Sequence, residues 1–305
     1  MAAEVEGGLP SVAVVGLGHM GLAIAERLID AGYPVAVANR TPGRDTELVE
    51  RGATRLDSVA AALVHAGICV TSLADDAAVR SAILGDGGIL RDARTGGTLV
   101  EMSTISVAAS AEVAEGAAEA GVRYLRAPLS GNPAAVRSGS AACFVSGPAE
   151  ESERREQLLR TIAPAVRYLG EGEQARVAKL ALQVLIGGTT ELLAEALVLG
   201  ESSGLDRSTL LEVIGTSVIG SKFVEYKSGP LISDDYSSTF TTDMMRKDVD
   251  LVLELAGETG VELPFTSELR SLLEETSEAG HGEDDFSALL LRLTRRVEAP
   301  GPRRK

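Results

Sequence analysis

The sequence predicts an α/β fold in which a doubly wound, mostly parallel sheet is followed by an all-helical C-terminal domain. Two observations support this assignment. From Ser11 to about Gly170, short apolar β-rich runs alternate with Ala-rich helical stretches, which is the pattern of parallel strands joined by crossover helices. Beyond Gly170 the strand pattern stops, and a helical periodicity continues to about Arg296. We therefore divide the chain into domains 1–172 and 173–305.

Each predicted element follows from its local periodicity. The strands of the first domain are Val12–Val15, Val35–Ala38, Ile68–Ser72, Thr98–Glu101, Val122–Leu125, Ala141–Ser146 and Val166–Leu169. The clearest helices between them are Gly21–Ala31, Ala77–Leu84 and Val107–Ala120. The helices of the second domain are Glu173–Ser203, Leu210–Thr216, Thr241–Thr259, Ser267–Thr276 and Phe286–Val297.

Composition excludes several classes of protein. The 29 Lys and Arg against 44 Asp and Glu give a net charge of −15, so the chain repels phosphate backbones and nucleic acid is not an expected partner. The two isolated cysteines, Cys69 and Cys143, are expected to be buried and reduced, and three scattered histidines predict no metal site. No charge-free apolar stretch of about 18 residues is present, so we expect no membrane span and a cytoplasmic protein.

A glycine-rich loop, Gly16-Leu17-Gly18-His19-Met20-Gly21, follows the first strand. GxGxxG between a strand and a helix is the fingerprint of a Rossmann-like, dinucleotide-binding fold. The first glycine permits the tight turn, the second lets a pyrophosphate approach the backbone, and the third lets helix and strand pack closely. The N–H groups of the helix N-terminus then attract the anion. His19 would lie at the phosphate end of such a site, and we expect no proton-transfer role for it.

The end of the second strand predicts which dinucleotide is bound. A protein that prefers NAD usually places a carboxylate about 20 residues after the glycine loop, but Asn39, Arg40 and Thr41 stand there. A guanidinium binds a 2′-phosphate through charge-assisted hydrogen bonds, whereas a carboxylate would repel it. We therefore predict that NADPH is preferred. In the alternative, Arg40 only stacks on the adenine and NADH serves equally well.

The long apolar helix of the second domain carries a lysine. Between residues 177 and 188 the polar side chains are almost confined to Lys179 and Gln183, which are four apart and share a face. A narrow polar stripe on a buried helix predicts a ligand cavity, in which desolvation would lower the pKa of lysine from about 10.4 towards about 7–8 and suit it to acid–base catalysis. Alternatively, Lys179 snorkels to solvent or pairs with Glu191 or Glu195.

These residues together resemble the β-hydroxyacid dehydrogenase family, to which 3-hydroxyisobutyrate dehydrogenase belongs. The resemblance extends from about Val12 to Leu293 and rests on ordered blocks of sequence. The blocks are Gly16–Gly21, Asn39–Thr41, Ser103-Thr104, Ala127–Gly131 and the Lys179 helix. It implies a Rossmann-like domain followed by a helical domain, with an active site between them, and an assembly of two or four copies joined through the helical domain.

The resemblance also implies roles for individual residues. Lys179 would be the catalytic acid–base, acting on a small anionic substrate such as a β-hydroxyacid or semialdehyde. The substrate-binding residues would be Ser130, Gly131, Asn132, Gln183 and Lys247. The cofactor-binding residues would be Gly16, Leu17, Gly18, His19, Met20, Gly21, Asn39, Arg40, Thr41, Leu73, Thr104 and Lys247. Apart from the resemblance, we expect Asp248 to be structural and to pair within its helix or across domains.

Three positions depart from the family pattern. Gln183 replaces the usual asparagine, Asn132 replaces a glycine of the substrate loop, and Ser106-Val107 stand where a proline is usual. All three are near the predicted substrate end, so we expect a shifted substrate with the cofactor role retained. Two other functions are considered. Imine reductases share this architecture but usually carry another residue at the position of Lys179, and a module that binds the cofactor without catalysis would have no need of this lysine.

Overall fold

The computed structural model describes residues 8–237 and 240–298. It divides the chain into two compact units, Met1–Lys179 and Leu180–Lys305, called unit 1 and unit 2 below. The division falls inside the long helix α9 (Gln174–Ser202), whereas the sequence predicts it at residue 172. The change in periodicity marks the residue where α9 begins. The first turns of α9 nevertheless belong to unit 1, because side chains such as Arg176 form hydrogen bonds with residues of unit 1.

A six-stranded parallel sheet with the order β3-β2-β1-β4-β5-β6 forms the centre of unit 1. Its strands are β1 (Val12–Val15), β2 (Val35–Ala38), β3 (Thr54–Arg55), β4 (Ile68–Thr71), β5 (Thr98–Glu101) and β6 (Arg123–Arg126). All but β3 were predicted to within one residue. The strand order reverses between β1 and β4, and open α/β sheets bind ligands at the carboxyl ends of the strands at this point.

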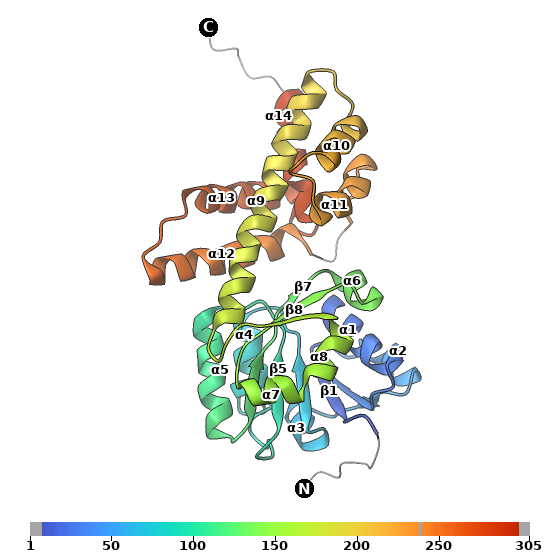
Figure 1. The fold of residues 1–305 in the computed structure, drawn as a ribbon, viewed down its shortest axis with the longest axis vertical. Coiled ribbons are helices and arrows are strands. Elements are labelled where there is room, and N and C mark those ends of the chain that lie inside the picture. The colour runs from blue at the N-terminus through green and yellow to red at the C-terminus, as the bar shows by residue number, and fades with distance from the viewer. Residues whose placement is uncertain (1–7, 238–239, 299–305) are drawn as a thin grey trace. The chain divides into compact units, whose positions relative to one another are not determined.

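Helices cover both faces of this sheet, with α1 and α5 on opposite sides (Figure 1). Val12 and Val14 of β1 pack with α1 and α8, and Ala13 and Val15 pack with α3 and α5. Both alternating sets are therefore buried, which explains the continuous apolar strands. The helices of unit 1 are α1 (His19–Asp30), α2 (Thr46–Glu50), α3 (Ala62–His65), α4 (Asp76–Val79), α5 (Val107–Glu119), α6 (Pro133–Ser138), α7 (Ala149–Arg154) and α8 (Glu156–Ile162), with short turns Val59–Ala61 and Arg80–Leu84.

The last two predicted strands form a separate sheet. Its strands are β7 (Leu129–Ser130), β8 (Ala142–Val145) and β9 (Ala165–Tyr168). β7 pairs antiparallel with β8, and β8 pairs parallel with β9. The expectation of one sheet is therefore wrong. Pro128 follows β6 and has no N–H for a strand ladder, and strand periodicity alone does not specify which strand is the partner.

Unit 2 is built from helices. They are α9 from Leu180 onward, α10 (Arg207–Thr216), α11 (Lys222–Ile232), α12 (Thr242–Thr259), α13 (Pro264–Thr276) and α14 (Leu289–Glu298), with short turns Ser277–His281 and Phe286–Ala288. The sequence missed α11. This helix contains Gly229 and Pro230, which disfavour a helix interior, but Val224 and Leu231 bury its apolar side in the core of unit 2.

One face of α9 is exposed, which corrects the expectation of a buried helix. Leu185, Leu192 and Leu199 are 64%, 57% and 71% exposed, whereas Leu193 and Leu197 of the same helix are buried. By length and composition α9 would be able to cross a membrane, but a core helix passes the same test. The apolar residues of α9 therefore form two faces. One face packs in the core of unit 2, and the other is exposed to solvent in the single chain.

Candidate cofactor and catalytic site

The glycine loop joins β1 to α1 in unit 1. Gly16 has φ +90°, and a Cβ there would lie 2.3 Å from the carbonyl oxygen of Ser72, so glycine is required. A Cβ on Gly21 would lie 1.8 Å from the carbonyl oxygen of Gly16, which explains the third glycine. A Cβ built on Gly18 meets no described atom within 4 Å. The backbone at Gly18 is thus open to a pyrophosphate, and the loop fits a dinucleotide.

The predicted loop residues differ in what they face. Gly18 and His19 are exposed and Met20 is half-buried, and Gly18 begins α1 without a side-chain cap. Leu17 is different, because its side chain is buried in the core and its N–H donates to Asn39 Oδ1 at 3.0 Å. Leu17 therefore supports the shape of the loop.

The end of β2 is tied to the glycine loop through the side chain of Asn39. Its Oδ1 accepts from Leu17, and its Nδ2 donates to the carbonyl oxygen of Thr41 at 2.9 Å. Both ends of the amide are thus bonded to backbone, and Asn39 shapes this turn. The side chains of Arg40 and Thr41 that follow are exposed. An arginine therefore follows β2 at the place where many NAD-binding proteins carry a carboxylate.

Two further turns meet at the carboxyl edge of the sheet, after the neighbouring strands β4 and β5. Leu73 donates its N–H to Ser103 Oγ at 2.8 Å, so the turns that carry Leu73 and Thr104 are joined. The N–H of Ser103 in turn donates to Glu101 Oε1 at 2.8 Å. Glu101 was not among the predicted site residues. Its charge at the end of an apolar strand was the feature that could have identified it.

The missing proline has a local explanation. Ser106 is the N-cap of α5, and its Oγ accepts from the N–H of Ala109 at 3.0 Å. Its own N–H donates to Asp76 Oδ1 at 2.9 Å. Val107 is the first residue of α5, where proline is favoured but not needed once the helix is capped. This departure therefore concerns the start of α5 and gives no support to a shifted substrate.

The predicted substrate loop joins β7 to α6. Gly131 has φ +138° and is exposed, and Ser130 is half-buried. Asn132 has an extended backbone with φ −101°, and its Oδ1 caps α6 by accepting from Ala135 at 2.8 Å. The substitution of glycine by asparagine is thus explained by helix capping, because Asn132 takes no left-handed conformation.

Lys179 is the last residue of unit 1 and lies in the second turn of α9. It is half-buried. The alternative in which Lys179 pairs with Glu191 or Glu195 is wrong. These residues lie 12 and 16 positions further along the same continuous helix, which places them about 18 and 24 Å from Lys179 along the helix axis. Glu191 instead pairs with Arg292 in unit 2.

Two predicted substrate residues, Gln183 and Lys247, lie together in unit 2. Gln183 Nε2 donates to Asp248 Oδ2, and Lys247 Nζ lies 2.6 Å from Asp248 Oδ1. Asp248 therefore has the structural role expected for it. Gln183 is 1% exposed, and its Oε1 has no hydrogen-bond partner in the described part of the chain. A buried amide oxygen in this state can accept a hydrogen bond from a ligand.

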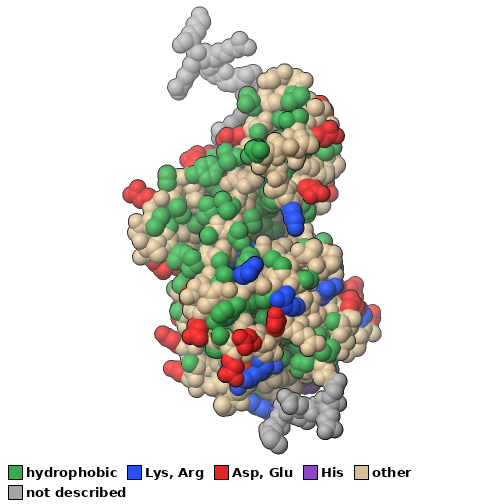
Figure 2. Space-filling model, in the orientation of Figure 1, with side chains coloured by type: hydrophobic (Ala, Val, Ile, Leu, Met, Phe, Trp, Pro, Cys, Tyr) green, Lys and Arg blue, Asp and Glu red, His purple; other side chains and the backbone are tan. Residues whose placement is uncertain are grey.

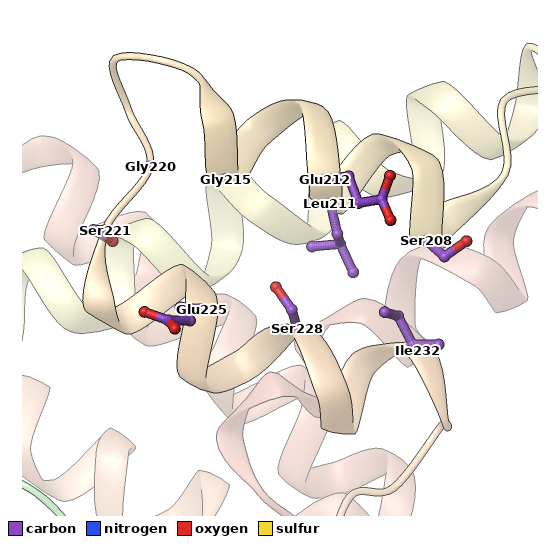
Figure 3. A pocket seen from close by; sticks show the side chains of 9 residues that line it. All are labelled: Ser208, Leu211, Glu212, Gly215, Gly220, Ser221, Glu225, Ser228 and Ile232. Atoms are coloured by element: carbon purple, nitrogen blue, oxygen red, sulfur yellow. The ribbon is translucent and has the colours of Figure 1, made fainter.

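A groove of about 440 Å³ lies between α10 and α11 of unit 2 (Figure 3). Serine hydroxyls and the carboxylates of Glu212 and Glu225 face it. None of the predicted site residues lines this groove. Two carboxylates would repel an acidic substrate, so we do not assign the substrate to it.

Both cysteines are free and buried, as predicted. Burial raises the pKa of Cys69, and it raises the pKa of Cys143 to about 12, so both are thiols packed in the core of unit 1. Among the described residues, no group of three or more His, Cys, Asp or Glu side chains could hold a metal ion.

Comparison with known proteins extends these observations. The profile of the NAD binding domain of 6-phosphogluconate dehydrogenase matches residues 11–170. The profile described as NAD-binding of NADP-dependent 3-hydroxyisobutyrate dehydrogenase matches residues 173–293. A 3-hydroxyisobutyrate dehydrogenase of Pseudomonas aeruginosa is 32% identical over 290 residues, covering 92% of this chain and 97% of that relative.

Solved structures agree with this relationship. A 3-hydroxyisobutyrate dehydrogenase from Salmonella typhimurium superimposes with a TM-score of 0.85 at 25% identity, covering 93% of this chain and all of the other. An imine reductase from Pseudomonas sp. reaches a TM-score of 0.63 at 24% identity, covering 93% and 99%, which shows a shared fold. The first profile covers the glycine loop, and the second covers the helix that carries Lys179. Together with the relative that matches along nearly its whole length, they show that the chain belongs to the β-hydroxyacid dehydrogenase family and is an NAD(P)-dependent oxidoreductase that acts on hydroxyl groups.

Proposed function

We propose that the protein is an NADPH-dependent oxidoreductase that transfers a hydride between the nicotinamide and a small β-hydroxyacid, semialdehyde or ketoacid, with Lys179 as the acid–base. The observation that supports this most is the place of Lys179. It is a half-buried lysine in the same compact unit as the glycine loop and the Ser103–Thr104 turn. A lysine at such a position can exchange a proton with a substrate oxygen.

The residues divide the chemistry among them. The glycine loop and the N-terminus of α1 hold the pyrophosphate, and Arg40 binds the 2′-phosphate. NADPH supplies the hydride when it is bound. In reduction, the Lys179 ammonium donates a proton to the substrate oxygen, and in oxidation its amine accepts that proton back.

The proposed substrate residues provide both charge and hydrogen bonds. Ser130 offers a hydroxyl and Gly131 a backbone N–H, which suit a carboxylate. Lys247 offers a cation, although Asp248 already neutralises part of its charge. Gln183 offers an acceptor oxygen, since its nitrogen is bonded to Asp248. Residues of these types favour a substrate that carries a carboxylate together with a hydroxyl or another hydrogen-bond donor.

The activity is tested with a panel of β-hydroxyacids with NADP⁺, semialdehydes and ketoacids with NADPH, and a cyclic imine with NADPH. We expect turnover of at least one hydroxyacid–carbonyl pair and none of the imine. Turnover confined to the imine would replace the proposal with imine reduction. Cofactor binding without any turnover would favour a non-catalytic module.

Replacing Arg40 by alanine is expected to weaken NADPH binding about 10- to 100-fold and to leave NADH binding within about threefold. A lost charge-assisted bidentate contact accounts for this difference. The Kd values are measured by fluorescence titration of the purified protein with both cofactors. Arg51→Ala is the matched control, because Arg51 is an arginine of unit 1 that pairs with Asp30. Equal losses for the two cofactors in the Arg40 variant would leave only the stacking alternative.

The exposed face of α9 predicts self-association. Leu185, Leu192 and Leu199 recur every seven residues and therefore lie along one side of the helix. Figure 2 shows hydrophobic side chains gathered over the part of unit 2 where Figure 1 draws α9, α12 and α13, and Phe265 of α13 is also exposed. A large apolar patch of this kind is typical of an interface. We propose that a second copy of the chain covers it.

Light scattering after size exclusion tests this proposal. The wild-type protein is expected to contain two or four copies, and Leu192→Glu is expected to be a single chain with unchanged helix content. A charge placed in an apolar contact is not compensated there. Val218→Glu is the control, because Val218 is fully exposed and lies outside α9. A wild-type protein that is a single chain at micromolar concentration would contradict the prediction.

A further inference from the structure

We propose that the buried pair Arg176–Glu101 is a positioning device that fixes Lys179 relative to the Ser103–Thr104 turn. The inference rests on the proposed role of Lys179 as the acid–base. It adds two residues that the motifs of the family resemblance did not include. Neither touches the reacting atoms in this scheme, and both act through their neighbours.

Arg176 enters unit 1 from the first turn of α9 and is 1% exposed. Its guanidinium forms an ion pair with the fully buried Glu101 at the end of β5. Nη1 donates to the carbonyl oxygen of Ser103 at 2.6 Å, and Nη2 donates to the hydroxyl of Tyr124 at 3.1 Å. Nε donates to Ser110 Oγ at 3.3 Å. The planar, five-donor group is thus bound on several sides, which fixes its orientation.

The same carboxylate holds the cofactor turn. One oxygen of Glu101 pairs with Arg176, and the other accepts from the N–H of Ser103 at 2.8 Å. Ser103 Oγ accepts in turn from the N–H of Leu73 at 2.8 Å. A continuous chain of hydrogen bonds therefore runs from the turn after β4, through the turn after β5, to the first turn of α9.

Lys179 follows Arg176 by three residues. Positions three apart are neighbours on the same side of a helix, about 4.5 Å apart along its axis. The division into compact units falls directly after Lys179. The segment that Arg176 anchors is therefore the segment that carries the lysine, and its position relative to the turn at Thr104 is set within unit 1.

A contribution to the free energy of folding does not by itself explain why Arg176 and Glu101 are buried as an ion pair. Removing two charges from water costs free energy that a buried ion pair does not always recover, and apolar side chains of similar volume often stabilise as well. Burial opposes the charge of Arg176, but Glu101 and Tyr124 outweigh it and the pKa of Arg176 is raised. The guanidinium therefore keeps its charge, and its fixed set of donors makes the pair directional. Such a pair fixes geometry in a way that packing does not.

The test uses Arg176→Met and the double variant Glu101→Gln/Arg176→Met. Glutamine keeps an acceptor for Ser103, and the double variant leaves no unpaired buried charge, so it is expected to fold even if the single variant does not. We expect kcat to fall about 10- to 100-fold, as for a small misplacement of a reacting group. The KM and the Kd of NADPH should stay within about threefold. Without cofactor, amide hydrogen exchange of residues 174–180 should accelerate at least about tenfold.

Arg155→Met is the matched control. Arg155 pairs with the buried Glu151 at 2.7 Å and donates to Thr98 at the opposite end of β5. This variant removes an arginine that pairs with a buried carboxylate and also bonds to β5, but at the end of the strand away from Glu101. We expect similar or greater loss of thermal stability in this control, with kcat and the exchange of residues 174–180 unchanged.

A double-mutant cycle with Lys179→Ala separates positioning from general stability. In the alanine background, the Arg176 variants should lower the residual rate by less than about twofold, because the group that they position is gone. The inference would be overturned if the Arg176 variants lowered kcat by the same factor with and without Lys179. It would also be overturned if, with Lys179 present, their kcat stayed within threefold of the wild type. If Lys179→Ala itself retains full turnover, the proposed function fails instead, so the two failures are distinguishable.

Discussion

Replacing Lys179 by alanine is expected to lower kcat about 10²-fold or more, with the Kd of NADPH changed less than about threefold. The lysine is proposed to exchange the proton of the substrate oxygen, an interaction that strengthens in the transition state, so its removal lowers kcat and kcat/KM together. The residues assigned to the pyrophosphate lie in the glycine loop and α1 and are untouched. Stopped-flow or steady-state assays with the best substrate of the panel measure kcat, and fluorescence titration measures Kd.

Lys222→Ala is the matched control for this variant. Lys222 is an exposed lysine at the start of α11, so its loss removes the same charge and a comparable side chain without touching the proposed site. Its kcat should equal that of the wild type. Undiminished turnover in the Lys179 variant would show that another group, or water, supplies the proton.

Substitutions of Gly18 and Gly21 are expected to separate cofactor binding from folding. Gly18→Ala should change the free energy of unfolding by less than about 1 kcal/mol, because Gly18 has φ −70° and no described atom lies near the added methyl. The methyl would occupy the space proposed for the pyrophosphate. Loss of one or two charge-assisted hydrogen bonds there predicts NADPH binding weakened about 10- to 100-fold.

Gly21→Ala should act on folding first. The added Cβ would lie 1.8 Å from the carbonyl oxygen of Gly16, so β1 and α1 must separate, at a cost of about 1–3 kcal/mol or more. Thermal unfolding with and without NADPH measures both variants. A Gly18 variant that binds NADPH normally, or a Gly21 variant as stable as the wild type, would contradict the loop geometry.

The elements that the sequence predicted well are those fixed by local patterns. The apolar runs of β1, β2 and β5 are buried on both faces. In the glycine loop, the positive φ of Gly16 and the contact between Gly21 and Gly16, five residues apart, are local requirements for glycine. The elements that it missed depend on distant partners. The separate sheet of β7, β8 and β9 follows from pairings that periodicity does not encode, and α11 forms despite Pro230 because its apolar side is buried.

The candidate site shows the same distinction. Spacing alone identified the loop, Arg40 at the end of β2 and a lysine on an apolar helix. Only the tertiary structure brought Glu101 and Arg176, 75 residues apart, into one buried pair, and joined Gln183 to Asp248 across 65 residues. It also assigned Asn132 and Ser106 to helix capping.

The sequence by itself determined the order of the elements, the turn that accepts a dinucleotide and the residue types available for chemistry. Each of these depends on sterics and hydrophobic periodicity over a few neighbouring residues. The tertiary structure decided which polar groups are buried together and which apolar face of α9 remains exposed. Burial of a charge or an amide costs free energy unless a specific partner meets it, and that partner is set by the packing of the whole unit.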